Sequence, residues 1–166
     1  RELMERFLHG EFFSVDSIHN SDSLVYKTKR GRKVFGGGGI MPDIFVARDT
    51  SEYSSYLTKI INYGYLYQFA FKYTDQNRDK LKSFKNWQEM KNYLEKQNLL
   101  ADFVNFAETK GVKSSTSDLN ISKNYILHLL NAYITRNILG DEGFYPLYFQ
   151  RDETVLRALE EIKKIK

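Results

Sequence analysis

The sequence contains no cysteine among its 166 residues. This absence excludes disulfide bonds and metal sites held by thiolates. It does not decide the cellular compartment, because many exported bacterial proteins also lack cysteine. The sequence also lacks any run of about 18–20 apolar residues, the length that a membrane-spanning helix needs. We therefore expect no membrane span, and the net charge of +4 is mild.

Residues that could hold a metal ion or act as paired catalytic acids are scattered. The three histidines, His9, His19 and His128, lie far apart in the sequence. A metal site needs clustered His, Asp or Glu side chains, so we predict no metal site, and no pattern predicts a cofactor. Glu160 and Glu161 lie among lysines in a helical stretch, which favours a solvated helix face over a catalytic pair.

Aromatic residues are in surplus, with 12 Tyr and 12 Phe. Aromatic side chains bury large areas, and tyrosine keeps one polar end. The run from Tyr63 to Tyr73 therefore predicts either a tightly packed helix core or a surface that docks another domain or subunit. The chain length suits one domain, or one domain with a small appendage.

The first fifty residues predict a short β segment. Leu24–Thr28 and Lys33–Phe35 are strand-like, and Lys29–Arg32 between them predict a hairpin with a basic tip. Ile44–Val46 predict a further short buried strand. Between the second and third of these strands we expect a structural turn, in which the Asp43 carboxylate accepts backbone N–H groups. The residues of this turn are Gly36, Gly37, Gly38, Gly39, Ile40, Met41, Pro42 and Asp43. A phosphate-binding loop is disfavoured, because it needs Gly-Lys-Ser/Thr at the start of a helix.

The sequence becomes helical after Val46. Asp49–Glu52 has the spacing of a capping box. Apolar residues follow at helical spacing, namely Tyr53, Tyr56, Leu57, Ile60 and Ile61. Gly64 is expected to break or kink this helix before Tyr65–Tyr73 continues it.

Two shorter helices are expected next. Asn86 and Asn98 predict their starts, because asparagine is a favoured N-cap residue. Gly111 predicts the end of the second helix. Lys113–Asp118 is rich in Ser and Thr and predicts a loop, which is the best candidate for an internal linker.

The most regular helical pattern begins at Asn120 and ends at Gly140. Its wide apolar arc consists of Ile121, Tyr125, Ile126, Leu129, Leu130, Tyr133, Ile134 and Ile138. A narrow polar stripe on the same helix consists of Asn124, His128, Asn131 and Thr135. An arc this wide implies contacts on more than one side, so we expect this helix to be central.

The C-terminal residues predict an aromatic connector, Phe144–Phe149, followed by a last helix that Asp152 caps. The apolar face of that helix consists of Val155, Leu156, Leu159 and Ile162. The predicted fold is mainly α, a C-terminal bundle of about five to six helices with a short N-terminal β segment. Its expected parts are a lead-in (1–22), the β segment (23–50) and a helical domain (51–166).

Part of this sequence resembles a known family. Residues 31–43, Gly-Arg-Lys-Val-Phe-Gly-Gly-Gly-Gly-Ile-Met-Pro-Asp, resemble the Gly-Ile-x-Pro-Asp segment of the carboxy-terminal processing, or tail-specific, serine peptidases. His9–Ser14 and Tyr67–Asp75 resemble the long Bacteroidetes-like branch of that family. The resemblance is specific from residue 9 to residue 78 and weaker afterwards.

The resemblance implies an enzyme whose chemistry lies upstream of this chain. In the family a serine nucleophile and a lysine base cleave the peptide bond, and both precede the Pro-Asp segment. No serine or lysine here matches their sequence contexts, so no residue is assigned a catalytic role. The resemblance assigns only a structural role, as positions of the family motif, to Gly39, Ile40, Pro42 and Asp43.

We therefore expect a C-terminal piece of such a peptidase that is inactive alone. Its implied partners are the upstream catalytic and PDZ domains and protein or peptide substrates, in the periplasm or cell envelope. The helices would pack on the catalytic core, form a homodimer or limit substrate access.

Two alternative functions remain open. The first is a stand-alone helical module that binds other proteins. The second is a nucleic-acid binder, because phosphate contacts need clustered Lys and Arg, as in Lys27, Lys29, Arg30, Arg32 and Lys33. That run is short and Asp22 lies near it, so we expect no nucleic acid as a partner.

Overall fold

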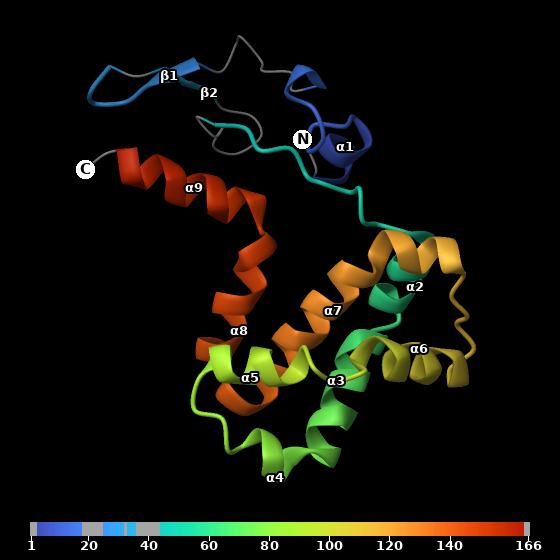
Figure 1. The fold of residues 1–166 in the computed structure, drawn as a ribbon. Helices are drawn as coiled ribbons and strands as arrows, with labels where there is room; N and C mark the ends of the chain where they lie inside the picture. Colours follow the sequence, from blue (N-terminus) through green and yellow to red (C-terminus); the bar gives the residue numbers. More distant parts are fainter. Residues whose placement is uncertain (1–2, 18–24, 32, 36–43, 165–166) are drawn as a thin grey trace. The chain divides into compact units, whose positions relative to one another are not determined.

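The computed structural model describes residues 3–17, 25–31, 33–35 and 44–164. The chain forms two compact units, Arg1–Asp49 and Thr50–Lys166. The elements of the first unit are α1 (Leu3–Leu8), the 3-10 turn η1 (Val15–Ser17), β1 (Val25–Lys27) and β2 (Lys33–Phe35). The described part of the chain is mainly helical (Figure 1), so the predicted fold class is confirmed.

The two strands form the predicted hairpin. They pair antiparallel, with Val25 opposite Phe35 and Lys27 opposite Lys33. Gly31 turns the chain with a φ of 81°, and its N–H donates to the Thr28 carbonyl at 2.9 Å. A positive φ of this kind is adopted by glycine at little steric cost.

The strand predicted at Ile44–Val46 is wrong, because these residues form no strand. The sheet in the described residues has two strands, β1 and β2, and a strand is stabilised by backbone pairing with a neighbour. Ile44 is 41% exposed rather than buried. The turn predicted just before it lies outside the described residues, which applies to Gly36, Gly37, Gly38, Gly39, Ile40, Met41, Pro42 and Asp43.

The second unit contains the helical bundle. Its elements are α2 (Ser55–Asn62), α3 (Tyr65–Gln76), α4 (Arg78–Leu81), α5 (Trp87–Leu94), α6 (Leu99–Thr109), α7 (Thr116–Leu139), α8 (Asp141–Tyr148), η2 (Phe149–Arg151) and α9 (Glu153–Lys164). The helices beyond the predicted five to six include the single turn α4 and the helix α8, which replaces the expected aromatic connector.

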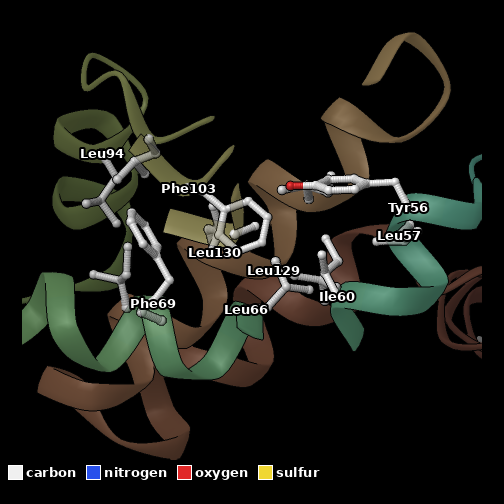
Figure 2. Packing of buried hydrophobic residues seen from close by; sticks show 14 of the residues in the cluster. Tyr56, Leu57, Ile60, Leu66, Phe69, Leu94, Phe103, Leu129 and Leu130 are labelled. Carbon is white, nitrogen blue, oxygen red and sulfur yellow. The ribbon is translucent and has the colours of Figure 1, made fainter. Parts of the chain in front are cut away.

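The predicted central position of α7 is confirmed. This helix contacts α2, α3, α5, α6 and α8, and it runs through the middle of the bundle in Figure 1. Figure 2 shows Leu129 and Leu130 of α7 packed among side chains from α2, α3 and α6. Phe69 of α3 meets Phe103 of α6 edge-on, with ring centroids 5.5 Å apart. Burial against five helices makes α7 the scaffold on which the other helices are placed.

The start of α2 differs from the prediction. The N-cap is Ser54, whose side chain accepts from the Leu57 N–H at 3.1 Å, so the capping box predicted at Asp49–Glu52 is wrong. The Ser54 N–H donates to Ser122 Oγ on α7 at 3.1 Å, and Ser122 Oγ donates to the Glu52 carbonyl at 2.6 Å. These contacts with another helix select the cap.

The start of α7 also lies earlier than predicted. Ser115 is the N-cap, with the Asp118 N–H donating to its Oγ at 3.0 Å, so the predicted start at Asn120 is wrong. Ser115 Oγ also donates to Asp118 Oδ2 at 2.6 Å. This bond is the main reason why the pKa of the Asp118 carboxyl lies below its ordinary value. The segment predicted as a loop, Lys113–Asp118, is therefore partly the first turn of α7.

Other predicted helix ends are confirmed. Asn86 caps α5 by accepting from the Glu89 N–H at 2.9 Å, and α6 begins after Asn98, although the Asn98 side chain makes no cap bond. Gly111 ends α6 with a φ of 86°. The Val112 N–H then donates to the Ala107 carbonyl at 3.0 Å, the bond expected of a Schellman ending. Gly64 separates α2 from α3 with a φ of 66°.

The aromatic connector predicted at Phe144–Phe149 is wrong, because Phe144 to Tyr148 belong to α8. A side chain at Gly143 would place its Cβ 2.7 Å from Leu139 Cβ and 2.8 Å from Thr135 Cγ2. Glycine therefore allows α8 to approach α7 closely. The approach buries Phe144 and Leu147, which stabilises a helix that its glycine and proline disfavour locally.

Candidate functional site

A cleft of about 740 Å³ opens on the helical unit, between α5, the start of α6, α7, the end of α8 and η2. Ligand-binding clefts typically enclose about 300–1,000 Å³. The polar residues that line it are Lys91, Glu95, Gln97, Asn98, Asn124, His128, Asn131, Gln150 and Arg151. Its apolar lining consists of Leu94, Leu100, Ala101, Leu127 and Leu147. The cleft therefore combines an apolar wall with many amide groups.

The side of the cleft formed by α7 is the polar stripe seen in the sequence. Asn124, His128 and Asn131 follow one another at helical spacings of four and three residues, which places them on one face. All three line the cleft. Thr135 continues the stripe one turn further but does not line the cleft. The stripe thus marks where the otherwise apolar helix α7 meets a polar hollow.

His128 has a defined hydrogen-bonding state. Its Nε2 lies 3.1 Å from the Tyr148 carbonyl oxygen. A carbonyl only accepts, so Nε2 carries the hydrogen of the neutral ring and Nδ1 is left as an acceptor. Burial lowers the pKa of His128 below its ordinary value, and the positive charges of Arg151 and Lys91 lower it further. His128 is therefore a neutral hydrogen-bonding group at neutral pH.

Asn131 is the most informative residue of the cleft. It is 8% exposed, and its Oδ1 is buried without a hydrogen-bond partner among the described residues. Thr135 Oγ1 is in the same state. A buried polar atom left without a partner costs about 1–3 kcal/mol. Because Oδ1 itself is buried, the Asn131 amide would have to turn toward the cleft before a ligand there could remove this cost.

The charged groups at the cleft are already engaged. Lys91 Nζ donates to Gln150 Oε1 at 3.0 Å and lies 3.8 Å from Glu95 Oε1. Arg151 forms an ion pair with Glu52, and its guanidinium lies 6.0 Å from the centroid of the Tyr125 ring. Opposite charges thus offset one another, and the arrangement favours a ligand that is recognised by hydrogen bonds rather than by charge.

Within the helical unit, Glu160 and Glu161 do not line this cleft. His9 belongs to the first unit, and His19 lies outside the described residues. Glu161 on α9 bonds with Lys164 at 2.7 Å and with Arg157 at 2.8 Å. These bonds, the first of them above all, place the pKa of its carboxyl below the ordinary value. Within the described ranges no three His, Asp or Glu side chains are grouped as metal ligands would be.

The aromatic run from Tyr63 to Tyr73 has two faces. Leu66 and Phe69 are buried in the core, whereas Tyr67 and Phe71 are 53% and 55% exposed. One face thus belongs to the core, and docking by the other face stays a prediction. In the first unit the described tip residues Lys29 and Arg30 are exposed, which leaves the nucleic-acid alternative untested.

Sequence reasoning recognised the α7 stripe but not the cleft. The residues that α5, α6 and η2 contribute were missed, because nothing in their local sequence distinguishes them from other exposed polar residues. The usable signal was the polar stripe at helical spacing, which interrupts the wide apolar arc of this helix. Among the described helices, none has the length and apolar character needed to cross a membrane.

The fold and the cleft define a helical domain built around one central helix. The chain belongs to the family described as a family of unknown function (DUF8443), whose model matches residues 56–140, more than half of the chain. The match runs from α2 to the end of α7, so most of the cleft lies inside it while α8 and α9 lie outside. Neither the curated proteins nor the solved structures gave a match.

Proposed function

We propose that this chain is the non-catalytic C-terminal part of a carboxy-terminal processing serine peptidase. We also propose that its helical unit binds a peptide segment in the cleft lined by Asn124, His128 and Asn131. The peptidase assignment is supported by the sequence resemblance of residues 9–78, above all by the Gly-Ile-Met-Pro-Asp segment, Gly39–Asp43. With it comes the proposal of a location in the periplasm or cell envelope. The parent would hydrolyse peptide bonds near substrate C-termini with a serine and a lysine upstream of Arg1.

The binding role is supported by the chemistry of the cleft. Five of its lining side chains are amides: Gln97, Asn98, Asn124, Asn131 and Gln150. An amide side chain offers both donors and an acceptor, which complement the N–H and C=O groups of a peptide backbone. Gln97 already donates to the Tyr93 carbonyl at 3.1 Å and Gln150 already accepts from Lys91, so these two amides offer only their remaining groups. The apolar wall would receive a side chain of the bound segment.

The observation that carries this proposal is the unpaired Oδ1 of Asn131. The terminal torsion of asparagine is soft, so the amide can turn to present its oxygen or its nitrogen to a ligand. A hydrogen bond there would remove the penalty of about 1–3 kcal/mol. A stand-alone interaction module would use the cleft in the same way and would differ only in having no peptidase domain upstream.

The binding role is tested by selecting peptides from a random display library on the full chain and titrating the best one by calorimetry. Asn131→Leu should weaken binding about 5- to 100-fold, the range of a lost buried hydrogen bond. Thr135→Val is the matched control, because Thr135 Oγ1 is also unpaired and buried but Thr135 does not line the cleft. The affinity of the Thr135→Val variant for the peptide should equal that of the wild type. Equal affinity for wild type and Asn131→Leu would contradict the proposal.

The peptidase assignment is tested separately by the reading frame upstream of Arg1. It should encode the serine and lysine contexts of the family, and the chain alone should hydrolyse no peptide. A frame without those contexts would reject the peptidase assignment and leave the binding role of the cleft intact.

A further inference from the structure

The last helix, α9, is amphipathic but has no buried residue. Leu156, Leu159 and Ile162 are 42%, 49% and 57% exposed. With Val155 they lie on one face of the helix, at spacings of three and four residues. An exposed apolar stripe on a regular helix marks a surface that another molecule covers.

Apart from Val155, whose mirror position is Lys163, the apolar pattern of α9 is symmetric about Leu159. Leu156 and Ile162 lie three residues before and three residues after it, and Leu159 is near the middle of Glu153–Lys164. When two copies of such a helix lie antiparallel, Leu159 faces its own equivalent and Leu156 faces Ile162 of the other copy. This is the self-complementary arrangement that a two-fold dimer requires.

The charges of α9 are arranged with opposite signs at its two ends. Asp152 and Glu153 are at the start, and Lys163 and Lys164 are in the last turn. In an antiparallel pair centred on Leu159, the acidic start of each helix lies within about one turn of the basic end of the other, at both ends of the interface. Lys164 already pairs with Glu161 in its own helix at 2.7 Å, so Lys163 is the main basic group for this contact. A parallel pair would instead bring like charges together, which is destabilising. Arg157 and Glu161 lie on the opposite face and pair with each other at 2.8 Å within the helix.

From this pattern we infer that α9 is a self-association surface, on which the α9 of a second copy of this chain lies antiparallel with the two Leu159 side chains at its centre. A helix of twelve residues is about 18 Å long and about 10 Å wide. Its face covers far less than the roughly 800 Å² per partner of a standard stable interface. The dimer is therefore weak and reversible, and it forms as concentration rises.

Analytical ultracentrifugation of the full chain over a wide concentration range tests the inference. The wild type should pass from monomer to dimer, and Leu159→Asp, which places two carboxylates at the centre, should weaken association at least tenfold. Ile121→Asp is the matched control, because Ile121 is 43% exposed on α7; its association should equal that of the wild type. A chain that stays monomeric, or dimers that tolerate Leu159→Asp, would overturn the inference.

The orientation can be tested because the chain has no cysteine, so an introduced thiol is the only one present. A mixture of the Leu156→Cys and Ile162→Cys variants should form a mixed disulfide dimer on mild oxidation, well above the yield of either variant alone. Cross-linking of Leu156→Cys with itself, without the mixed product, would show a parallel pair and reject the proposed geometry. Binding of α9 to anionic lipid vesicles without self-association would also reject it.

The dimer and the peptide-binding role rest on different surfaces. Leu159→Asp should leave affinity for the selected peptide unchanged, and Asn131→Leu should leave the dimer unchanged. Loss of one property without the other therefore identifies which of the two proposals has failed.

Discussion

The helices α7 and α9 belong to the same unit but differ in how far other helices bury them. α7 contacts five other helices and buries eight of its residues, whereas α9 buries none. The apolar residues of α7 accordingly spread over most of its circumference, and those of α9 are confined to one face. In α7 the exception is a polar stripe that lines the cleft, and in α9 it is an apolar stripe in contact with water.

The two exceptions carry complementary information. A polar group inside a core costs free energy unless it is paired, so unpaired atoms on α7 suggest a ligand. An apolar stripe in water forgoes burial worth roughly 25 cal/mol per Å², so the uncovered face of α9 suggests a partner. In each helix we assign to binding one residue that the fold does not satisfy, Asn131 at the cleft on α7 and Leu159 on α9.

The largest expected effect compares the two helices directly. Leu130→Ala on α7 removes a fully buried side chain and should lower the free energy of unfolding by about 2–5 kcal/mol. Leu159→Ala on α9 should change it by less than about 0.5 kcal/mol in dilute solution, because its side chain is already half exposed. Urea denaturation of the full chain at low concentration measures both. Equal losses would show that α9 is covered within a single chain.

A smaller effect is expected where α8 approaches α7. Gly143→Ala adds a Cβ 2.7 Å from Leu139 Cβ, and overpacking of this kind costs about 1–3 kcal/mol. The better helix propensity of alanine returns about 0.5–1 kcal/mol, so the net effect should be a loss of stability of up to about 2.5 kcal/mol. Asn92→Ala, at an exposed position of α5, is the control and should not be destabilised. A stabilised Gly143→Ala variant would mean that the two helices do not touch there.

The sequence predicted the parts of this fold that depend on local signals. Gly64, Gly111 and Gly140 marked helix ends, and the apolar arc of α7 indicated its central position, because each pattern lies within a few turns of chain. The predicted start of α2 was wrong because Ser54 also bonds across to Ser122 on α7. Such a tertiary bond outweighs a capping signal worth about 1 kcal/mol. The predicted start of α7 was wrong for a local reason, because the cap formed by Ser115 and Asp118 was not recognised in the sequence.

The candidate site was predictable only in part. The stripe on α7 was visible because its members share one helix. The cleft depends on which helices meet that stripe, and α8, which completes it, was hidden by a glycine and a proline that disfavour a helix locally. Packing of Phe144 and Leu147 against α7 reverses that local preference.

The unpaired hydroxyl of Thr135 offers a gain in stability. Thr135→Val keeps the shape of the side chain and removes the buried Oγ1 that has no partner among the described residues. Replacing such a group with an apolar one should raise the free energy of unfolding by about 1 kcal/mol, measured by urea denaturation. A loss of stability would show that Oγ1 is paired in solution, for example through a bound water.

The smallest expected effect is a dependence on pH from His128. Burial lowers its pKa in the folded chain below the ordinary value of 6.5, so the unfolded chain takes up the proton first as pH falls. The free energy of unfolding should therefore decrease as pH falls below about 6.5, until the folded pKa is reached, and His128 should not affect it above pH about 6.5.

The variant His128→Gln keeps a donor for the Tyr148 carbonyl but does not titrate. The difference in stability between the two proteins should be constant above pH about 6.5 and should shift in favour of His128→Gln below it. A shift in favour of the wild type would mean that His128 is charged in the folded cleft, and its role as a neutral acceptor through Nδ1 would then be wrong.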